Sequence, residues 1–214
     1  MPASLTAIDV LLDPDASMLE RAAELNARML TSVPSPPGFA LDTAHHPHVT
    51  VLQRYVRTAQ LERVCEAIHA VRAAVDLEAL TLTAHALSHV MLQPPIGIGV
   101  VVVAPGPEVR DFQRRLIDAI EPFTGSGGTA DAFVRTEAEP DINHETIRFI
   151  EEYVPQHSGE NYVAHVTVGL ATLDDLASFE AEPFEPLTFS ADAVSVYQLG
   201  DNGAAALRLR TWTR

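Results

Sequence analysis

The chain has 214 residues, 47% hydrophobic and 20% charged, which is typical of globular domains and excludes a disordered or fibrous protein. Its formal net charge is −15, and all fourteen basic residues are arginines, so extended binding to long nucleic acids is not expected. A small anionic substrate held by a few arginines remains compatible with this charge. The single cysteine, Cys65, excludes an intramolecular disulfide.

Patterning in the first half of the chain predicts seven elements. Short apolar runs indicate strands, and apolar residues at helical spacing indicate helices. In chain order these elements are a strand at 7–12, a helix at 18–30, a proline-rich loop at 33–38, a strand at 48–56, a helix with an apolar stripe at 61–75 and Thr58 as its N-cap, and strands at 80–91 and 96–104.

The same order of elements then recurs in the second half. The predicted elements are a helix at 107–121, a shorter helix at 144–153, a strand at 162–170, a helix capped by Thr172, and strands at 187–199 and 204–213 around a turn at 200–203. The interval from Pro14 to His48 is 34 residues, whereas that from Pro105 to His165 is 60, so the second copy carries an insertion at about 124–156. Within it, residues 125–128 (Gly-Ser-Gly-Gly) are typical of a flexible linker.

We therefore predict one bilobal domain over residues 1–214. Lobe one would cover about 1–92 and lobe two about 93–214, because neither repeat can bury its sheet alone. The N-terminus lacks the pattern of a signal peptide, and the longest apolar stretch, 96–105, is too short to span a bilayer. We expect a cytoplasmic monomer with no membrane partner.

The two central strands carry the same tetrapeptide. One reads His48-Val49-Thr50-Val51 and the other His165-Val166-Thr167-Val168. Side chains alternate between the faces of a strand, so the histidine and threonine of each motif share a face while the valines point into the core. Imidazole transfers protons near neutral pH, and a threonine hydroxyl can donate to an oxygen on which charge develops. This pairing suits a phosphodiester.

These motifs resemble those of the two-histidine (2H) phosphoesterases, which include the 2′-5′ RNA ligases and the cyclic phosphodiesterases. The resemblance runs through nearly the whole chain and includes Pro47 and the segment 196–201 (Val-Tyr-Gln-Leu-Gly-Asp). It implies an α+β fold: a bilobal, pseudo-symmetric molecule whose lobes, each a mainly antiparallel sheet with helices, flank a central cleft.

The resemblance also implies chemistry at a 2′,3′-cyclic or related phosphodiester without ATP, metal or other cofactor. One of His48 and His165 would activate water or a 2′-hydroxyl, and the other would protonate the departing ribose oxygen. Thr50 and Thr167 would hold the phosphate. Which histidine is the base is left open. RNA-ligase-like members tend to carry a leucine-lysine-phenylalanine run after the first motif and an arginine after the second, whereas this chain has Leu52-Gln53-Arg54 and Gly169-Leu170 there. Both departures remove positive charge, so the substrate would be a small cyclic-phosphate nucleotide or an RNA 3′ end.

Four further residues are candidates for substrate binding. By strand alternation Arg54 falls on the face of His48 and Thr50 and could contact phosphate, with a solvated strand-end arginine as the alternative. Tyr55 and Tyr162 could stack on a base, although an aromatic residue beside a strand is more often core. His85 could line the cleft.

The sequence also offers a metal site and a binding-only protein as alternative functions. The cluster His45-His46-Pro47-His48 resembles a set of metal ligands. No carboxylate or cysteine stands at a spacing that would complete a metal site, so we expect no metal. A protein that only binds nucleotides or RNA ends has no need for two free imidazoles. Cyclic phosphodiesterase activity is therefore the main prediction; 2′-5′ RNA ligation and a non-catalytic binding module are the alternatives.

Overall fold

The structure is a computed structural model that describes residues 4–32, 38–42, 45–137 and 140–214. The predicted loop at 33–38 lies outside the described residues except for Gly38. The elements are β1 (Leu5–Pro14), α1 (Ala16–Ser32), β2 (Val49–Arg57), α2 (Leu61–Ala73), β3 (Thr81–Gln93), β4 (Ile96–Pro105), α3 (Pro107–Ile120), α4 (His144–His157), β5 (Ala164–Thr172), α5 (Leu173–Glu180), β6 (Leu187–Leu199) and β7 (Ala205–Thr213), joined in places by short 3₁₀ turns. The predicted α+β class and the order of elements are confirmed.

Two predicted helix caps have different outcomes. The Thr172 hydroxyl accepts a hydrogen bond from the Asp175 amide, so this threonine caps α5 as expected. Thr58 does not cap α2, because a 3₁₀ turn at Thr58–Gln60 precedes that helix. The Thr58 hydroxyl instead pairs with that of Thr6 on β1, 2.9 Å away.

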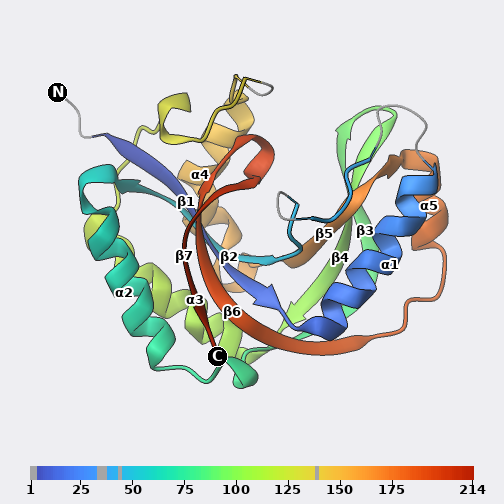
Figure 1. The fold of residues 1–214 in the computed structure, drawn as a ribbon, viewed down its shortest axis with the longest axis horizontal. Helices are drawn as coiled ribbons and strands as arrows, with labels where there is room; N and C mark the ends of the chain where they lie inside the picture. Colours follow the sequence, from blue (N-terminus) through green and yellow to red (C-terminus); the bar gives the residue numbers. More distant parts are fainter. Residues whose placement is uncertain (1–3, 33–37, 43–44, 138–139) are drawn as a thin grey trace.

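Seven antiparallel strands form the sheet in the order β1-β2-β5-β4-β3-β6-β7, with an additional pairing of β1 to β6. Strand β6 joins two groups of strands: its residues 187–190 pair with β3, and its residues 191–198 pair with β1. We call β2, β1, β7 and the later part of β6 the β1 lobe, and β5, β4, β3 and the start of β6 the β4 lobe. Figure 1 shows α2 and α3 beside the β1 lobe and α1 and α5 at the opposite end, beside the β4 lobe.

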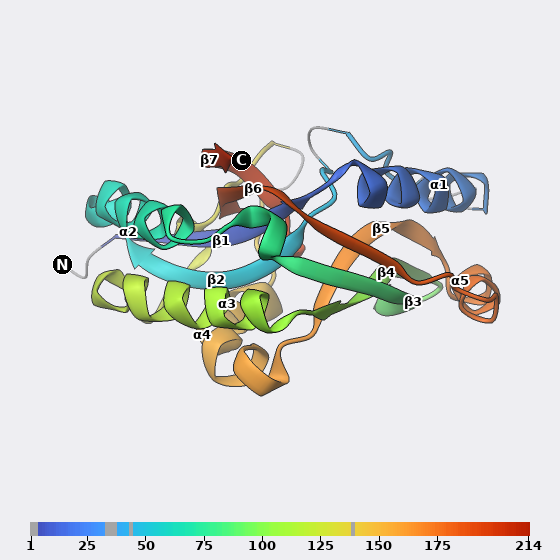
Figure 2. The same cartoon turned by 90° about the horizontal axis from the view of Figure 1, so that it is seen from below.

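The two lobes do not follow the two halves of the sequence. The boundary expected near residue 92 falls in the hairpin of β3 and β4, which pair along most of their length and therefore belong together. Helix α1, from the first half, packs on β5, while α3, from the second half, packs against α2 and β2. Figure 2 shows the same exchange from below, with α3 under β2 and α1 above β5.

The core lies between the sheet and its helices. Helix α3 has a fully buried apolar stripe, which consists of Val109, Phe112, Leu116 and Ile120. It belongs to one large apolar cluster with the motif valines Val49 and Val166. Within the described ranges, no helix is long and apolar enough to cross a membrane.

The insertion after α3 packs onto the β1 lobe through α4 and a second, smaller apolar cluster. Tyr55 on β2 lies in this cluster with Phe133 and Ile150. The glycine-rich residues 125–128 are part of this packing and are not a free linker. The Gly125 amide donates to the Tyr55 carbonyl, and the Gly127 amide donates to a carboxylate oxygen of Glu151.

We expect Gly128→Ala to lower the free energy of unfolding by about 1–3 kcal/mol, because the added methyl group overpacks a buried ring. A Cβ at residue 128 would lie 2.3 Å from atoms of the Tyr55 ring. Chemical denaturation measures the loss, and Ser126→Ala, at an exposed position of the same loop, is the control. Equal stability of the two variants would contradict the close packing of this loop.

Candidate active site

Strand pairing brings the two motifs together at one point of the sheet. Val49 on β2 is the register partner of Val166 on β5, and both side chains are fully buried. Continuing this antiparallel register by one residue in each direction sets His48 opposite Thr167 and Thr50 opposite His165. Directly opposed residues of an antiparallel pair point to the same face. The two imidazoles and two hydroxyls therefore share one face, with a histidine and a threonine in each row.

Each motif histidine is oriented by the carbonyl two residues before it. Nδ1 of His48 lies 2.7 Å from the carbonyl oxygen of His46, and Nδ1 of His165 lies 3.4 Å from that of Val163. A carbonyl only accepts, so Nδ1 carries the hydrogen and Nε2 of the neutral ring carries the lone pair. Among the described residues, nothing hydrogen-bonds Nε2 of either ring. Both rings thus present a nitrogen that can accept or deliver a proton.

The pKa of His165 is lowered from the ordinary value of an imidazole. The main cause is desolvation by the surrounding protein, and the charge of His48 adds to it, while the bond to the Val163 carbonyl opposes both. The His165 side chain still reaches solvent. At neutral pH this ring is therefore mostly neutral and able to accept a proton. Its interaction with His48 agrees with the closeness that the strand register requires.

A β-bulge follows the threonine of each motif. On β2, Leu52 pairs with Val10 and Thr50 with Leu11, so Val51 is an extra residue. On β5, Gly169 pairs with Gly99 and Thr167 with Val100, so Val168 is extra. A bulge bends the strand and leaves the inserted residue outside the ladder of backbone hydrogen bonds. The two motifs are therefore alike in backbone shape as well as in residues.

A buried amide side chain completes each bulge. Gln113 on α3 donates to the Val51 carbonyl over 2.8 Å, and Asn26 on α1 donates to the Val168 carbonyl over 2.9 Å. Both amides are almost fully buried. Sequence reasoning missed these residues, although each stands as a lone polar residue within the apolar stripe of its helix. That interruption was the available signal.

The two threonines differ in their partners. The Thr50 hydroxyl donates to Oδ2 of Asp9, a fully buried carboxyl group on β1, over 2.9 Å. The hydroxyl of Thr167 has no hydrogen-bond partner within the described part of the chain. Thr167 can donate directly to a ligand, whereas the hydrogen of Thr50 is already engaged. Asp9 was not among the predicted site residues.

The prediction for Arg54 is wrong because of the bulge at Val51. The extra residue reverses the alternation, so Gln53, not Arg54, shares the face of Thr50, and both donate to Asp9. Arg54 points to the opposite face, where its guanidinium forms an ion pair of 2.5 Å with Glu121 after α3. Arg54 therefore forms a structural ion pair on the face of the sheet opposite to the motif side chains.

The two tyrosines are not surfaces for base stacking. Tyr55 is 2% exposed and its hydroxyl donates to the Ile147 carbonyl of α4. Tyr162 is 5% exposed and its hydroxyl donates to the Thr50 carbonyl over 2.7 Å. Their rings are covered by the protein. Tyr162 instead supports the backbone of the first motif.

The remaining histidines have separate surroundings. His85 is exposed, and it is the extra residue of a bulge on β3 beside Ala86. Ala86, Val102 and His165 are successive register partners, so β3 lies two strands from His165, about 10 Å.

The histidines that precede the first motif have carboxylate partners of their own: His45 pairs with Asp42, and His46 lies 3.2 Å from Asp13. Among the described residues, no three His, Cys, Asp or Glu side chains converge on a possible metal position.

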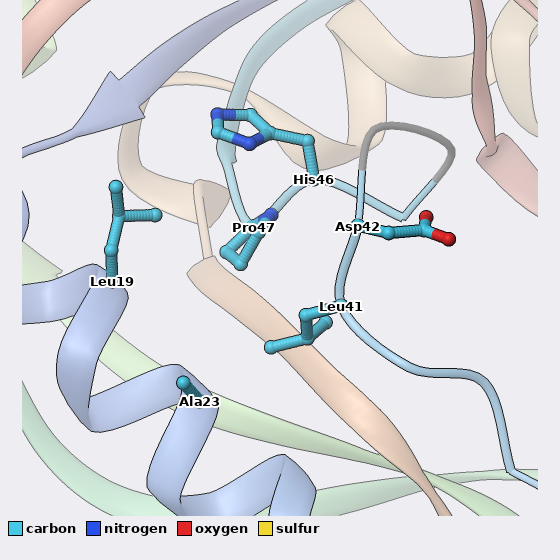
Figure 3. A pocket seen from close by; sticks show the side chains of 6 residues that line it. All are labelled: Leu19, Ala23, Leu41, Asp42, His46 and Pro47. Carbon is cyan, nitrogen blue, oxygen red and sulfur yellow. The ribbon is translucent and has the colours of Figure 1, made fainter.

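A pocket of about 340 Å³ lies beside the first motif, between α1 and the segment that leads to β2. Figure 3 shows Leu19 and Ala23 of α1 facing Leu41 and Pro47, with the ring of His46 at the rim and the Asp42 carboxylate turned away. Its walls are mostly apolar. It contains neither motif histidine.

The sequence matches no protein-family model and no curated protein. Solved structures are similar in fold. E. coli LigT complexed with NADP⁺ is 13% identical, with 98% of each chain covered and a TM-score of 0.51. A structure described only as a phosphoesterase, and Kluyveromyces marxianus Usb1 with uridine monophosphate, are each 11% identical over 98% of both chains, with TM-scores of 0.47. The LigT match confirms the fold that the resemblance to 2H phosphoesterases implied.

Proposed function

We propose that this protein is a metal-independent phosphodiesterase that opens 2′,3′-cyclic phosphates or related cyclic phosphodiesters on nucleotides or RNA ends. The observation that carries the proposal is the register at Val49 and Val166, which sets both motif histidines and both motif threonines on one face. Two imidazoles whose Nε2 atoms have no hydrogen-bond partner among the described residues can serve as a general acid and a general base. Two hydroxyls beside them can bind the non-bridging oxygens of a phosphate.

In this mechanism His165 is the base and His48 the acid. The lowered pKa of His165 keeps its Nε2 lone pair available at neutral pH. Water forms the new bond to phosphorus while its proton passes to Nε2 of His165. The bond from phosphorus to the leaving ribose oxygen breaks, and that oxygen takes the proton from Nε2 of His48. The two rings then exchange protons with solvent before the next turnover.

A small ligand suits the charge of the chain. The net charge of −15 disfavours long nucleic acids, and Arg54, which stands nearest to the motifs in sequence, is engaged by Glu121. The LigT structure that shares the fold holds NADP⁺, itself a nucleotide. The proposal includes a monomer in the cytoplasm, as the sequence predicts.

The direct test is hydrolysis of 2′,3′-cyclic nucleotides in the presence of EDTA, with identification of the 2′- or 3′-phosphate product. We expect turnover that the chelator leaves unchanged. Loss of turnover with EDTA would replace the proposal with metal-dependent chemistry. Binding of the cyclic nucleotide without any turnover would indicate a non-catalytic module.

The pH dependence tests the assignment of the base. Since the pKa of His165 is lowered, we expect the acidic limb of kcat/KM to have its midpoint below about 6.5, the value of a free imidazole. Activity should rise as the pH increases through this midpoint, because the base must lose its proton, and fall again when the acid does. Measurement of kcat/KM from pH 4.5 to 9 gives the midpoint of the acidic limb. An acidic midpoint above that of a free imidazole would argue against His165 as the base.

A further inference from the structure

Asp9 is a buried carboxyl group at the back of the site. Its Oδ2 atom accepts hydrogen bonds from Thr50 Oγ1 at 2.9 Å and from Gln53 Nε2 at 3.2 Å. Its Oδ1 atom and the Gln53 Oε1 atom are both buried without a hydrogen-bond partner in the described residues. A buried carboxylate with an unpartnered oxygen is costly, and protonation removes the charge.

The surroundings of Asp9 favour the neutral form. Desolvation raises its pKa, against the opposing effect of His48 and of the hydrogen bonds it accepts. The other titratable groups that face it are Tyr153 on α4 and Tyr162 before β5, with Tyr197 as its register partner on β6. Burial raises the pKa of all three tyrosines, so they stay neutral and supply no charge to balance a carboxylate.

The protonation of Asp9 decides what Thr50 can offer to a phosphate. A threonine hydroxyl has one hydrogen and two lone pairs. If Asp9 is ionised, that hydrogen is held by Oδ2, and Thr50 presents only lone pairs to the phosphate oxygens, which are acceptors themselves. If Asp9 is neutral, its own proton can be donated to Thr50 Oγ1. The Thr50 hydrogen is then free to turn toward the substrate.

We propose that Asp9 is a positioning residue that acts in its neutral form, donating to Thr50 so that Thr50 can donate to the phosphate. This inference rests on the proposed function, because it assigns Asp9 a part in binding the same phosphate. Ionisation of Asp9 withdraws the Thr50 hydrogen, so the contribution of the first motif weakens as pH rises. The second motif has no such dependence, because Thr167 has no carboxyl partner in the described chain.

Asp9→Asn tests the inference, because the asparagine amide is a permanent donor of nearly the same shape as the neutral acid. We expect the variant to keep most of the wild-type kcat/KM near pH 6 and to exceed the wild type at alkaline pH. Thr50→Val, which removes the hydroxyl altogether, should lose roughly 10²–10³-fold near pH 6 and less at alkaline pH, where the wild-type Thr50 no longer donates to the phosphate. An Asp9→Asn variant as impaired as Thr50→Val, or a ratio to wild type that does not rise with pH, overturns the inference.

Stability supplies a second readout that does not need activity. Because the pKa of Asp9 is raised in the folded state, the folded protein keeps a proton on Asp9 at pH values where the unfolded chain has lost it. The stability of the wild type should therefore fall as the pH rises above the pKa that Asp9 has in the unfolded chain. Asp9→Asn lacks this loss, and its advantage in Tm should grow with pH. An advantage that does not grow with pH overturns the neutral form. If the variant does not fold, the carbon-13 NMR titration of the Asp9 carboxyl in the wild type decides the same point: a raised pKa supports the inference and an ordinary one overturns it.

Asp15→Asn is the matched control. Desolvation opposes ionisation of Asp15, yet hydrogen bonds from Ser17, Ser190 and Met18 lower its pKa, so its stabilising effect is present at neutral pH and lost on acidification. The two variants should therefore shift Tm in opposite directions at neutral pH. Failure of the proposed function would appear as a wild type without turnover, whereas failure of this inference would leave turnover intact and the Asp9 readouts unchanged by pH.

Discussion

Replacing either motif histidine with alanine is expected to lower kcat/KM for a 2′,3′-cyclic nucleotide by about 10²–10⁴-fold, the usual contribution of a positioned general acid or base. His48 and His165 share one face of the sheet and keep their Nε2 atoms unpartnered in the described structure. Each variant removes one proton-transfer partner and leaves the other in place. Steady-state kinetics near neutral pH measure the loss.

The fold should survive these substitutions, because both side chains reach solvent while the neighbouring valines hold the strands together. Circular dichroism and Tm report on this. His89→Ala is the matched control: His89 forms an ion pair with Glu180 on α5 and lies outside the motifs. Full activity in the His48→Ala/His165→Ala double variant would reject two-histidine catalysis.

The largest effect on stability is expected from Asn26→Leu, at about 3 kcal/mol of unfolding free energy, because a buried carbonyl and two further backbone groups lose their partner. The Asn26 side chain binds the carbonyls of Val168 and Phe39 and the amide of Leu41. Leucine has the same number of side-chain heavy atoms and the same branching at Cγ, so it leaves no cavity, and the loss reports on the missing hydrogen bonds. Urea denaturation with an unchanged m-value is the measurement.

Gln113→Leu is the corresponding change in the other lobe and should cost about 2 kcal/mol, since Gln113 binds the Val51 carbonyl and the Gly159 amide. Ala27→Leu, on the exposed side of α1, is the control and should be nearly neutral. If Asn26→Leu and Gln113→Leu were as stable as this control, the amides would not be supporting the bulges.

The tetrapeptides could be recognised from sequence because histidine and threonine two residues apart on a strand need only local alternation to share a face. The helix stripes of α2 and α3 were predictable for the same reason. The side on which Arg54 lies was not, because one inserted residue at Val51 reverses every later side chain and leaves no mark in the hydrophobic pattern. The burial of the two tyrosines was not predictable either, because their partners are distant in sequence: Tyr55 packs with α4, and Tyr162 donates to the Thr50 carbonyl.

Local sequence patterns also could not predict which strands belong to which lobe. The repeated order of elements predicts two similar units, but either half of such a repeat can pair with itself or exchange segments with the other. Strand β3 follows the elements of the first unit and yet pairs with β4 and β6. Asp9 resembles any charged residue at a strand interior until the register with Gln53 and the covering by α4 are known.

The position of β6 in both lobes has a consequence for synthesis of the chain. Strands β1 and β3 are made early and can pair with β2 and β4, but the other edge of each stays open until β6, the sixth strand, has left the ribosome. Until then their open backbone edges can pair with other chains. Both lobes receive their last shared strand at the same moment, so we expect them to acquire the native state together, late in synthesis.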